Sequence, residues 1–234
     1  MTKYKSVKTL GILEGADNYN SWIASRVKKF IESPALEIGA GTGNISEYFS
    51  DLKELVLSDN DVNLVECLRN KFGGKKNVRV EILDISKHFS KIINKFSSIY
   101  AINVLEHIEQ DTIALSNINR LLKSDGRVVL LVPAKKFAYT KLDKSLGHFR
   151  RYEKKELREK LERAGFTVEY LEYFNIVGLF SWLIRTKLTR KHSELKSSHV
   201  KLFDFIVPIL RKTEPVNGMP LGISLIAVGK KVRL

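Results

Sequence analysis

Short apolar runs alternate with helix-like segments along most of the chain, and this alternation constrains the fold more than any other feature. The repeated order strand, helix, strand favours a parallel sheet with helices on both faces. Because such crossover connections are right-handed, the sheet is expected to be doubly wound. The strand-like runs cover residues 35–39, 54–59, 78–84, 97–103, 126–133, 166–174 and 222–231. Helix-like segments cover residues 44–52, 61–72, 110–123 and 153–165, with a short one at 86–93. We therefore predict a doubly wound α/β fold with a mostly parallel, seven-stranded sheet.

The length of 234 residues suits a single domain. We divide it into an N-terminal lid helix (1–33), a core half (34–133) and a second half (134–234). The alternation is interrupted twice, at 134–152 and by a helical insertion at 175–220 before the last strand.

The composition is that of an ordinary globular protein, with 44% hydrophobic and 9% aromatic residues. The single cysteine, Cys67, excludes a disulfide scaffold and a cysteine-based zinc site, which fits a reducing compartment. No run has the length of a signal peptide core or a membrane span. We expect a soluble cytoplasmic protein.

The positive charge is concentrated in the second half. Residues 134–234 hold 22 lysines and arginines against 10 acidic residues, whereas residues 1–133 hold 18 against 16. Such asymmetry favours an anionic partner: a nucleic acid, a phosphorylated substrate or a membrane surface. A solvated basic face is the alternative.

A glycine-rich loop follows the first strand, in the stretch "ALEIGAGTGNIS". A dinucleotide-binding loop has the pattern G-x-G-x-x-G, and its last glycine is Asn44 here. The pattern present is instead Glu37-x-Gly39-x-Gly41-x-Gly43. A carboxylate two residues before the first glycine would repel a phosphate and suit a cationic ligand.

Two further carboxylates follow the next two strands. Asp59 ends the second strand, where a carboxylate can accept hydrogen bonds from both hydroxyls of a ribose. Asp84 ends the third strand, within reach of an adenine amino group. The carboxylates of Glu37, Asp59 and Asp84 belong to three successive strands. They therefore predict one binding site for a nucleoside at the edge of the sheet where these strands end.

This arrangement resembles the class I S-adenosylmethionine-dependent methyltransferases, in particular their ubiquinone- and menaquinone-type members. The stretches "INVLEHI" and "LLKSDGRVVLLVPA" resemble that family's motifs at strands four and five. The resemblance implies S-adenosylmethionine as cofactor, S-adenosylhomocysteine as product, and cofactor contacts at Glu37, Gly39, Ala40, Gly41, Gly43, Asn44, Asp59, Asn60, Asp84, Ile85, Asn103 and Val104.

Two histidines are candidate catalytic residues if the acceptor is a hydroxyl that needs a general base. His107 follows the fourth strand, at the mouth of the expected cleft, and Glu106 precedes it. In some quinone-type relatives an E-x-x-E-H arrangement binds a divalent metal. The first glutamate is Asn103 here, so we expect no metal. Alternatively, Glu106 and His107 only orient the following helix.

The second histidine, His148, belongs to the dense donor set "GHFRRY" beyond strand five. This stretch resembles a subgroup of these methyltransferases often found near polysaccharide and lipid-glycan genes. Arginine forks bind phosphate or carboxylate, so Arg150, Arg151 and Tyr152 are candidates for binding the acceptor. Alternatively, the arginines pair with the acidic helix at 153–165 and Tyr152 packs.

The lid helix and the insertion carry aromatic residues. Tyr19 could cover the sulfonium of the cofactor, since a cation favours an aromatic face; Trp22 is equally suited to the core. The insertion begins as an apolar helix with Phe180 and Trp182, and basic residues follow. Such a helix suits a membrane surface, a lid over the acceptor, a dimer interface or simple packing.

We therefore predict a methyltransferase acting on an anionic small-molecule or lipid- or glycan-linked acceptor, with peripheral contact at the inner membrane surface. An RNA methyltransferase is the alternative, although its common N/D-P-P-Y/F signature is absent. A non-catalytic binding module is a third, less favoured one.

Overall fold

The computed structural model describes residues 15–87, 93–188, 197–215 and 219–232. Seven strands form one sheet in the order β3-β2-β1-β4-β5-β7-β6. Strand β7 is antiparallel to both of its neighbours, and the other pairings are parallel. The strands are β1 Ala35–Ile38, β2 Leu55–Asp59, β3 Val78–Ile82, β4 Phe96–Ile102, β5 Leu122–Pro133, β6 Phe166–Phe174 and β7 Ser224–Lys231. The predicted mostly parallel seven-stranded sheet is confirmed.

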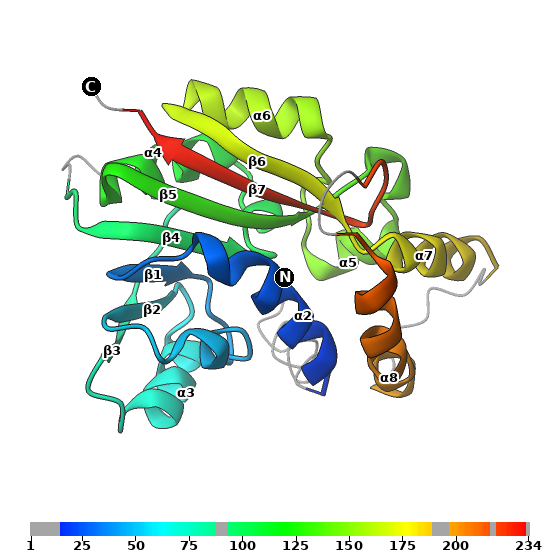
Figure 1. Cartoon of the computed structure of the whole chain (residues 1–234), viewed down its shortest axis with the longest axis horizontal. Helices are drawn as coiled ribbons and strands as arrows, with labels where there is room; N and C mark the ends of the chain where they lie inside the picture. The colour runs from blue at the N-terminus through cyan, green and yellow to red at the C-terminus, as the bar shows by residue number, and fades with distance from the viewer. Residues whose placement is uncertain (1–14, 88–92, 189–196, 216–218, 233–234) are drawn as a thin grey trace.

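Helices cover both faces of this sheet (Figure 1). Helices α4 and α6 pack on one face, and α2, α3 and α8 pack on the other. The helices are α2 Asp17–Val27, α3 Val62–Phe72, α4 Asp111–Leu121, α5 Lys141–Leu146, α6 Lys154–Arg163, α7 Ile176–Leu188 and α8 Ser197–Thr213. The predicted doubly wound architecture is thus present.

The strands alternate side chains between two apolar clusters, which is why a near-continuous apolar run such as β5 can be buried on both faces. Val128 and Leu130 of β5 belong to the cluster under α4 and α6, whereas Val129 and Leu131 belong to the cluster under α2 and α3. All four are fully buried.

One predicted helix is wrong. Residues 44–52 form only a short 3₁₀ turn, Ser46–Phe49. Ser46 donates its hydroxyl to the buried Glu37, and the Phe49 ring lies 4.8 Å from the Tyr100 ring, so the segment is tied to the sheet at both points. The short helix expected at 86–93 lies largely outside the described residues.

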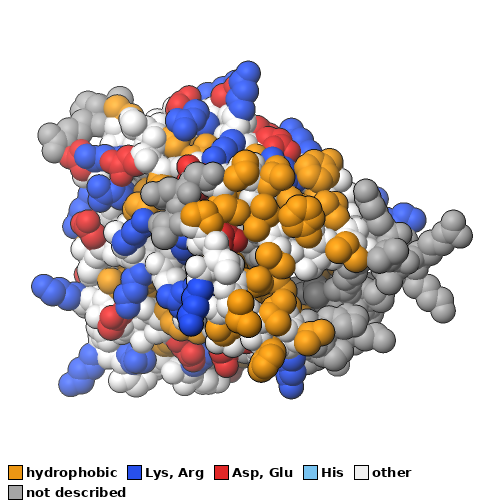
Figure 2. Space-filling view, turned by 45° about the vertical axis from the view of Figure 1, so that its right-hand side comes forward, with side chains coloured by type: hydrophobic (Ala, Val, Ile, Leu, Met, Phe, Trp, Pro, Cys, Tyr) orange, Lys and Arg blue, Asp and Glu red, His pale blue; other side chains and the backbone are white. Residues whose placement is uncertain are grey.

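The described part of the insertion at 175–220 contains helices α7 and α8, and α8 packs against α2. Asp204 of α8 accepts hydrogen bonds from the backbone of Asn18 and Tyr19. The outer faces of α7 and α8 are apolar and exposed (Figure 2). None of the described helices is long and apolar enough to cross a membrane.

Candidate functional site

A cavity of about 820 Å³ opens at the carboxyl ends of strands β1, β2 and β4. Ligands bind at this edge of doubly wound sheets, where neighbouring connections diverge. Among the residues predicted from sequence, the cavity is lined by Tyr19, Glu37, Gly39, Ala40, Gly41, Asn44, Asp59, Asn60, Asp84, Ile85, Asn103, Val104, His107 and His148.

The glycine loop after β1 has a backbone that side chains would not tolerate. Gly39, Gly41 and Gly43 all have positive φ angles. A Cβ at Gly39 would lie 2.6 Å from the side chain of Val104, so glycine is required there for the loop to approach the end of β4.

Gly43 packs against helix α3. It does not line the cavity, and a Cβ there would lie 2.6 Å from the Phe72 ring of α3. This glycine allows α3 to pack closely on the loop, and its contact with the cofactor stays a prediction.

Glu37 lies beneath the glycine loop and is almost completely buried. The hydroxyls of Ser46 and Tyr100 donate to one of its carboxyl oxygens, at 2.6 and 2.9 Å. Burial raises the pKa of Glu37 to about 7, against the opposing effect of these two hydrogen bonds. A cationic ligand in the cavity would therefore stabilise the ionised carboxylate.

Asp59 is held rigidly at the end of β2. Its two carboxyl oxygens accept hydrogen bonds from the backbone N–H groups of Gly41 and Asp61, both at 3.0 Å. Each oxygen keeps a further lone pair for a donor in the cavity. Asp84 is more exposed and accepts hydrogen bonds from the backbone and side chain of Ser86.

Asn103 and Val104, which follow β4, also line the cavity. Asn103 has a positive φ angle of 54°, and its N–H donates to the carbonyl of Leu131. This left-handed residue ends β4 and turns the chain into the 3₁₀ turn Leu105–His107.

The lid helix α2 contributes Tyr19 to the cavity, whereas Trp22 is 1% exposed and packs against Phe174. The interpretation of Trp22 as a core residue is confirmed. Tyr19 also contacts aromatic rings on three sides, including Phe174 and Phe203, so its ring is fixed in place.

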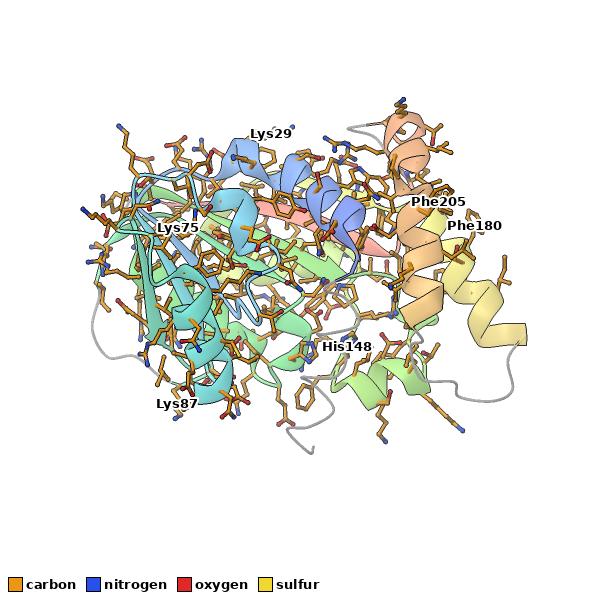
Figure 3. All side chains as sticks on the ribbon, turned by 90° about the horizontal axis from the view of Figure 1, so that it is seen from below. Lys29, Lys75, Lys87, His148, Phe180 and Phe205 are labelled. Carbon is orange, nitrogen blue, oxygen red and sulfur yellow. The ribbon has the colours of Figure 1, made fainter. Side chains whose placement is uncertain are left out.

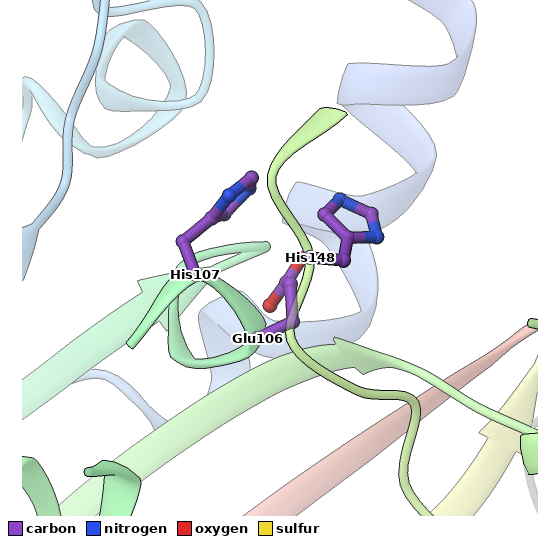
Figure 4. A group of neighbouring side chains, drawn as sticks. All are labelled: Glu106, His107 and His148. Atoms are coloured by element: carbon purple, nitrogen blue, oxygen red, sulfur yellow. The ribbon is translucent and has the colours of Figure 1, made fainter. Parts of the chain in front are cut away.

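Three side chains with metal-binding and acid–base chemistry meet at one end of the cavity: Glu106, His107 and His148 (Figure 4). The rings of His107 and His148 have centroids 4.7 Å apart. Burial raises the pKa of Glu106 to about 8, and burial together with the neighbouring His148 lowers the pKa of His107 to about 4. His148 is partly buried and lies in the loop after α5 (Figure 3).

The remaining residues of the GHFRRY loop mostly face the protein. Arg151 is 3% exposed, its Nε donates to Asp143 at 2.8 Å, and its guanidinium lies over the Trp182 ring. Tyr152 is fully buried, and its hydroxyl donates to Asp111 at 2.8 Å. Neither lines the cavity, so the prediction that Arg151 and Tyr152 bind the acceptor is corrected.

Arg150 also lies outside the cavity lining, but part of its side chain is exposed. It forms an ion pair with Asp111 at 2.8 Å and donates to the Glu109 carbonyl at 2.6 Å. The expected pairing of the two arginines with helix α6 is wrong, because their acidic partners are Asp111 and Asp143. A contact of Arg150 with the acceptor stays a prediction.

Several cavity residues were not predicted from sequence. Ser145 and Leu146 come from the short helix α5, and Asn20 and Ile23 come from the lid helix. Helix α5 lies in the segment where the strand–helix alternation fails, so periodicity gives no signal for it. Its signal is local: Thr140 and Asp143 form a capping box, and Gly147 ends the helix.

Comparison with known proteins agrees with the geometry. Residues 36–128 match the family model described as "Methyltransferase domain". A curated relative, the non-reducing polyketide synthase pkbA of Emericella nidulans, is 28% identical over 104 residues, which are 41% of this chain and 4% of that protein. The chain therefore spans a small fraction of the relative's length.

Solved structures share the fold. A SAM-dependent methyltransferase from Thermotoga maritima superimposes with a TM-score of 0.62 at 18% identity, covering 94% of this chain and 98% of the other. The CMeT domain of the citrinin polyketide synthase gives a TM-score of 0.56 at 15% identity, covering 86% of this chain and 46% of the other. At these identities the likeness concerns the fold.

Proposed function

We propose that this chain, which has the fold of the class I S-adenosylmethionine-dependent methyltransferases and a methyltransferase domain over residues 36–128, methylates a lipid- or glycan-linked anionic acceptor at a membrane surface. The observation that carries methyl transfer is the cavity itself. It combines a glycine loop, a buried carboxylate beneath that loop and a second carboxylate at the end of β2. Glu37 suits the cationic part of S-adenosylmethionine, and Asp59 suits its ribose.

The acceptor site of this proposal lies beside His107 and His148, which line the cavity and are not assigned to the cofactor. Methyl transfer is an in-line displacement, for which the protein supplies positioning and, for a hydroxyl acceptor, help with the proton. These two histidines are the side chains that we propose to contact the reacting atom.

The proposal of a lipid-linked acceptor rests on the exposed outer face of α7 and α8, which we call the apolar face. On α8, Leu202, Phe205 and Ile209 are 67%, 78% and 65% exposed, and they share one side of the helix. On α7, Phe180 and Ile184 are also more than half exposed. Figure 2 shows a large hydrophobic area on the surface of the molecule, and areas of this kind mark interaction sites.

The surroundings of the apolar face favour an anionic membrane as its partner. Lys201, Arg211 and Lys212 are exposed at the two ends of α8, and basic residues beside an apolar helix face suit an anionic lipid surface. The side chains of Arg185 and Lys187, and all of Arg190 and Lys191, lie outside the described residues. The proposed location is therefore the cytoplasmic side of a membrane.

The RNA alternative has weaker support. Many basic residues of the second half are engaged in ion pairs, including Lys136 with Glu156 and Lys160 with Asp111. Such pairing leaves fewer free cations for a phosphate backbone.

Vesicle binding and methyl transfer together test the proposal. The protein should bind vesicles that contain anionic phospholipid and transfer a labelled methyl group from S-adenosylmethionine to a lipid extract. A double change of Phe180 and Phe205 to Ser should abolish vesicle binding while leaving S-adenosylhomocysteine affinity unchanged. Ile82→Ser is the matched control, because Ile82 is 54% exposed on the edge strand β3.

Steeply salt-dependent binding to generic RNA without vesicle binding would favour the RNA alternative. Binding to neither would leave a soluble small molecule as the acceptor.

A further inference from the structure

The group Glu106, His107 and His148 brings together two imidazoles and one carboxylate. One ligand atom of each residue lies within 4.8 Å of the others. The first two residues belong to the turn after β4, and His148 comes from the loop after α5. Figure 4 shows the three side chains converging from these two segments. The local motif around Glu106 and His107 does not include His148, which lies 41 residues after His107 in the sequence.

Within the described part of the chain, the carboxyl group of Glu106 has no hydrogen bond to offset its burial. The residue is fully buried, yet neither carboxyl oxygen has a hydrogen-bond partner among the other described residues. Buried carboxylates in proteins are normally paired with a cation, bonded to donors or bound to a metal. The position of this orphan carboxyl beside two imidazoles points to a missing cation.

One ring nitrogen of His148 is engaged by a neighbour, and its other ring nitrogen is left for a ligand. Nδ1 of His148 lies 3.1 Å from a carboxyl oxygen of Asp143, which is itself fully buried and bonded to Arg151. Metal-binding histidines usually have such a second partner, which fixes the ring and its tautomer.

We propose that Glu106, His107 and His148 bind one divalent transition-metal ion, with Zn²⁺ as the best match. Two imidazoles and one carboxylate suit zinc and its neighbours, whereas Mg²⁺ and Ca²⁺ prefer all-oxygen sites. A bound ion requires ligand atoms about 3.4 Å apart, given bond lengths near 2.1 Å. His107 faces the open cavity, so its ring has room for the small closure needed.

Three protein ligands leave at least one coordination position for another molecule. All three residues line the cavity, so that position lies inside it. Resting on the proposed function, we infer that an oxygen atom of the acceptor occupies the open position. There the ion polarises the oxygen and favours its deprotonated form. The histidines then act on the acceptor as ligands and not as separate bases.

Titration of the whole, tag-free chain after treatment with a chelator tests the site. Calorimetry should show one equivalent of Zn²⁺ bound, and Mg²⁺ should bind at least a hundredfold more weakly. Co²⁺ should give visible absorption bands of a site with nitrogen and oxygen ligands. His148→Ala and Glu106→Gln should each weaken Zn²⁺ binding at least tenfold and change the Co²⁺ spectrum.

Glu109→Gln is the matched control for Glu106→Gln, because Glu109 lies three residues later and is exposed. This variant should leave Zn²⁺ affinity unchanged. Absence of Zn²⁺ binding by the unmodified chain would overturn the proposal. So would unchanged affinity and an unchanged Co²⁺ spectrum in either variant. The affinity of the chelator-treated protein for S-adenosylhomocysteine is measured in parallel. This affinity tests the proposed cofactor site independently of the metal.

Discussion

The two halves of the chain use similar polar residues for different purposes. In residues 34–133, Glu37 and Asp59 stand at the ends of parallel strands, and both line the cavity. In residues 134–234, Asp143 and Arg151 are as deeply buried, but they bind each other. In a doubly wound sheet, the carboxyl ends of the parallel strands border one crevice, so residues that follow these strands face it. The direction of a side chain on a connecting loop depends instead on the individual contacts that hold the loop. Residue type therefore indicates function more reliably in the first half than in the second.

The largest expected effect comes from breaking the buried pair in the second half. Arg151→Met should destabilise the protein by about 3–5 kcal/mol, because the carboxylate of Asp143 remains buried without its guanidinium partner. S-adenosylhomocysteine affinity of the folded variant should not change. Urea unfolding and calorimetry measure the two quantities.

Arg158→Met is the matched control for this prediction. Arg158 is about half exposed and has only a long ion pair with Glu162 at 3.9 Å, so its loss should change stability by less than about 0.5 kcal/mol. If Arg151→Met lost activity with normal stability, Arg151 would belong to the acceptor site after all.

In the first half, Glu37→Gln should stabilise the protein, in contrast to Arg151→Met, and the size of this effect should depend on pH. The folded-state pKa of Glu37 is raised from 4.5 to about 7, so the native state holds this proton more tightly than the unfolded state does. Stability therefore falls as pH rises from about 4.5 to about 7 and stays low above that. Glutamine avoids this loss, so the variant should be about 2–3 kcal/mol more stable at pH 8, with the gap closing toward pH 4.5.

The same variant should bind S-adenosylmethionine more weakly at pH 8, since it cannot become anionic beneath a cationic ligand. Unfolding curves between pH 5 and pH 8, with and without ligand, measure both effects. A stability gap that does not change with pH would show that Glu37 does not titrate in this range.

The contrast between the halves also explains how much the sequence could predict. Strand positions follow from alternating burial in runs such as residues 126–133, and the sheet follows from their spacing. The cavity residues at the ends of β1, β2 and β4 follow in turn, because topology brings strand ends together. These parts depend on local pattern and on a general rule of the fold.

Other parts depend on contacts between segments far apart in the sequence. The packing of Gly43 on Phe72, the pairing of Arg151 with Asp143 and the meeting of His107 with His148 all depend on how loops are anchored. A sequence pattern indicates that a residue is polar or small, and it does not indicate which neighbour that residue finds. The sequence-based expectation of no metal considered only the local spacing around His107.

A smaller effect is expected at the end of β2, and it separates binding from stability. Asp59→Ala should weaken S-adenosylmethionine binding by about ten- to a hundredfold, equivalent to about 1.4–2.7 kcal/mol, because two ribose hydroxyls lose their acceptor. Asp51→Ala is a control, since Asp51 is exposed and pairs only with Lys28. Unchanged affinity in calorimetry, or tighter binding of NAD than of S-adenosylhomocysteine, would contradict the proposed cofactor site.

The smallest effect is expected at Arg150, whose side chain is partly exposed and forms an ion pair with Asp111. Its side chain is 23% exposed, and its partner Asp111 keeps bonds to Lys160 and Tyr152 when the arginine is removed. Arg150→Ala should therefore cost about 0.5–1 kcal/mol of stability, with S-adenosylhomocysteine affinity unchanged. Arg150→Lys, which keeps the charge, should lie between the variant and the unmodified chain. A raised KM for the acceptor in Arg150→Ala, restored by Arg150→Lys at equal stability, would instead place this arginine at the acceptor. In that case Arg150 would join His148 as a polar residue of the second half that serves the site directly, and the difference between the halves would be one of degree.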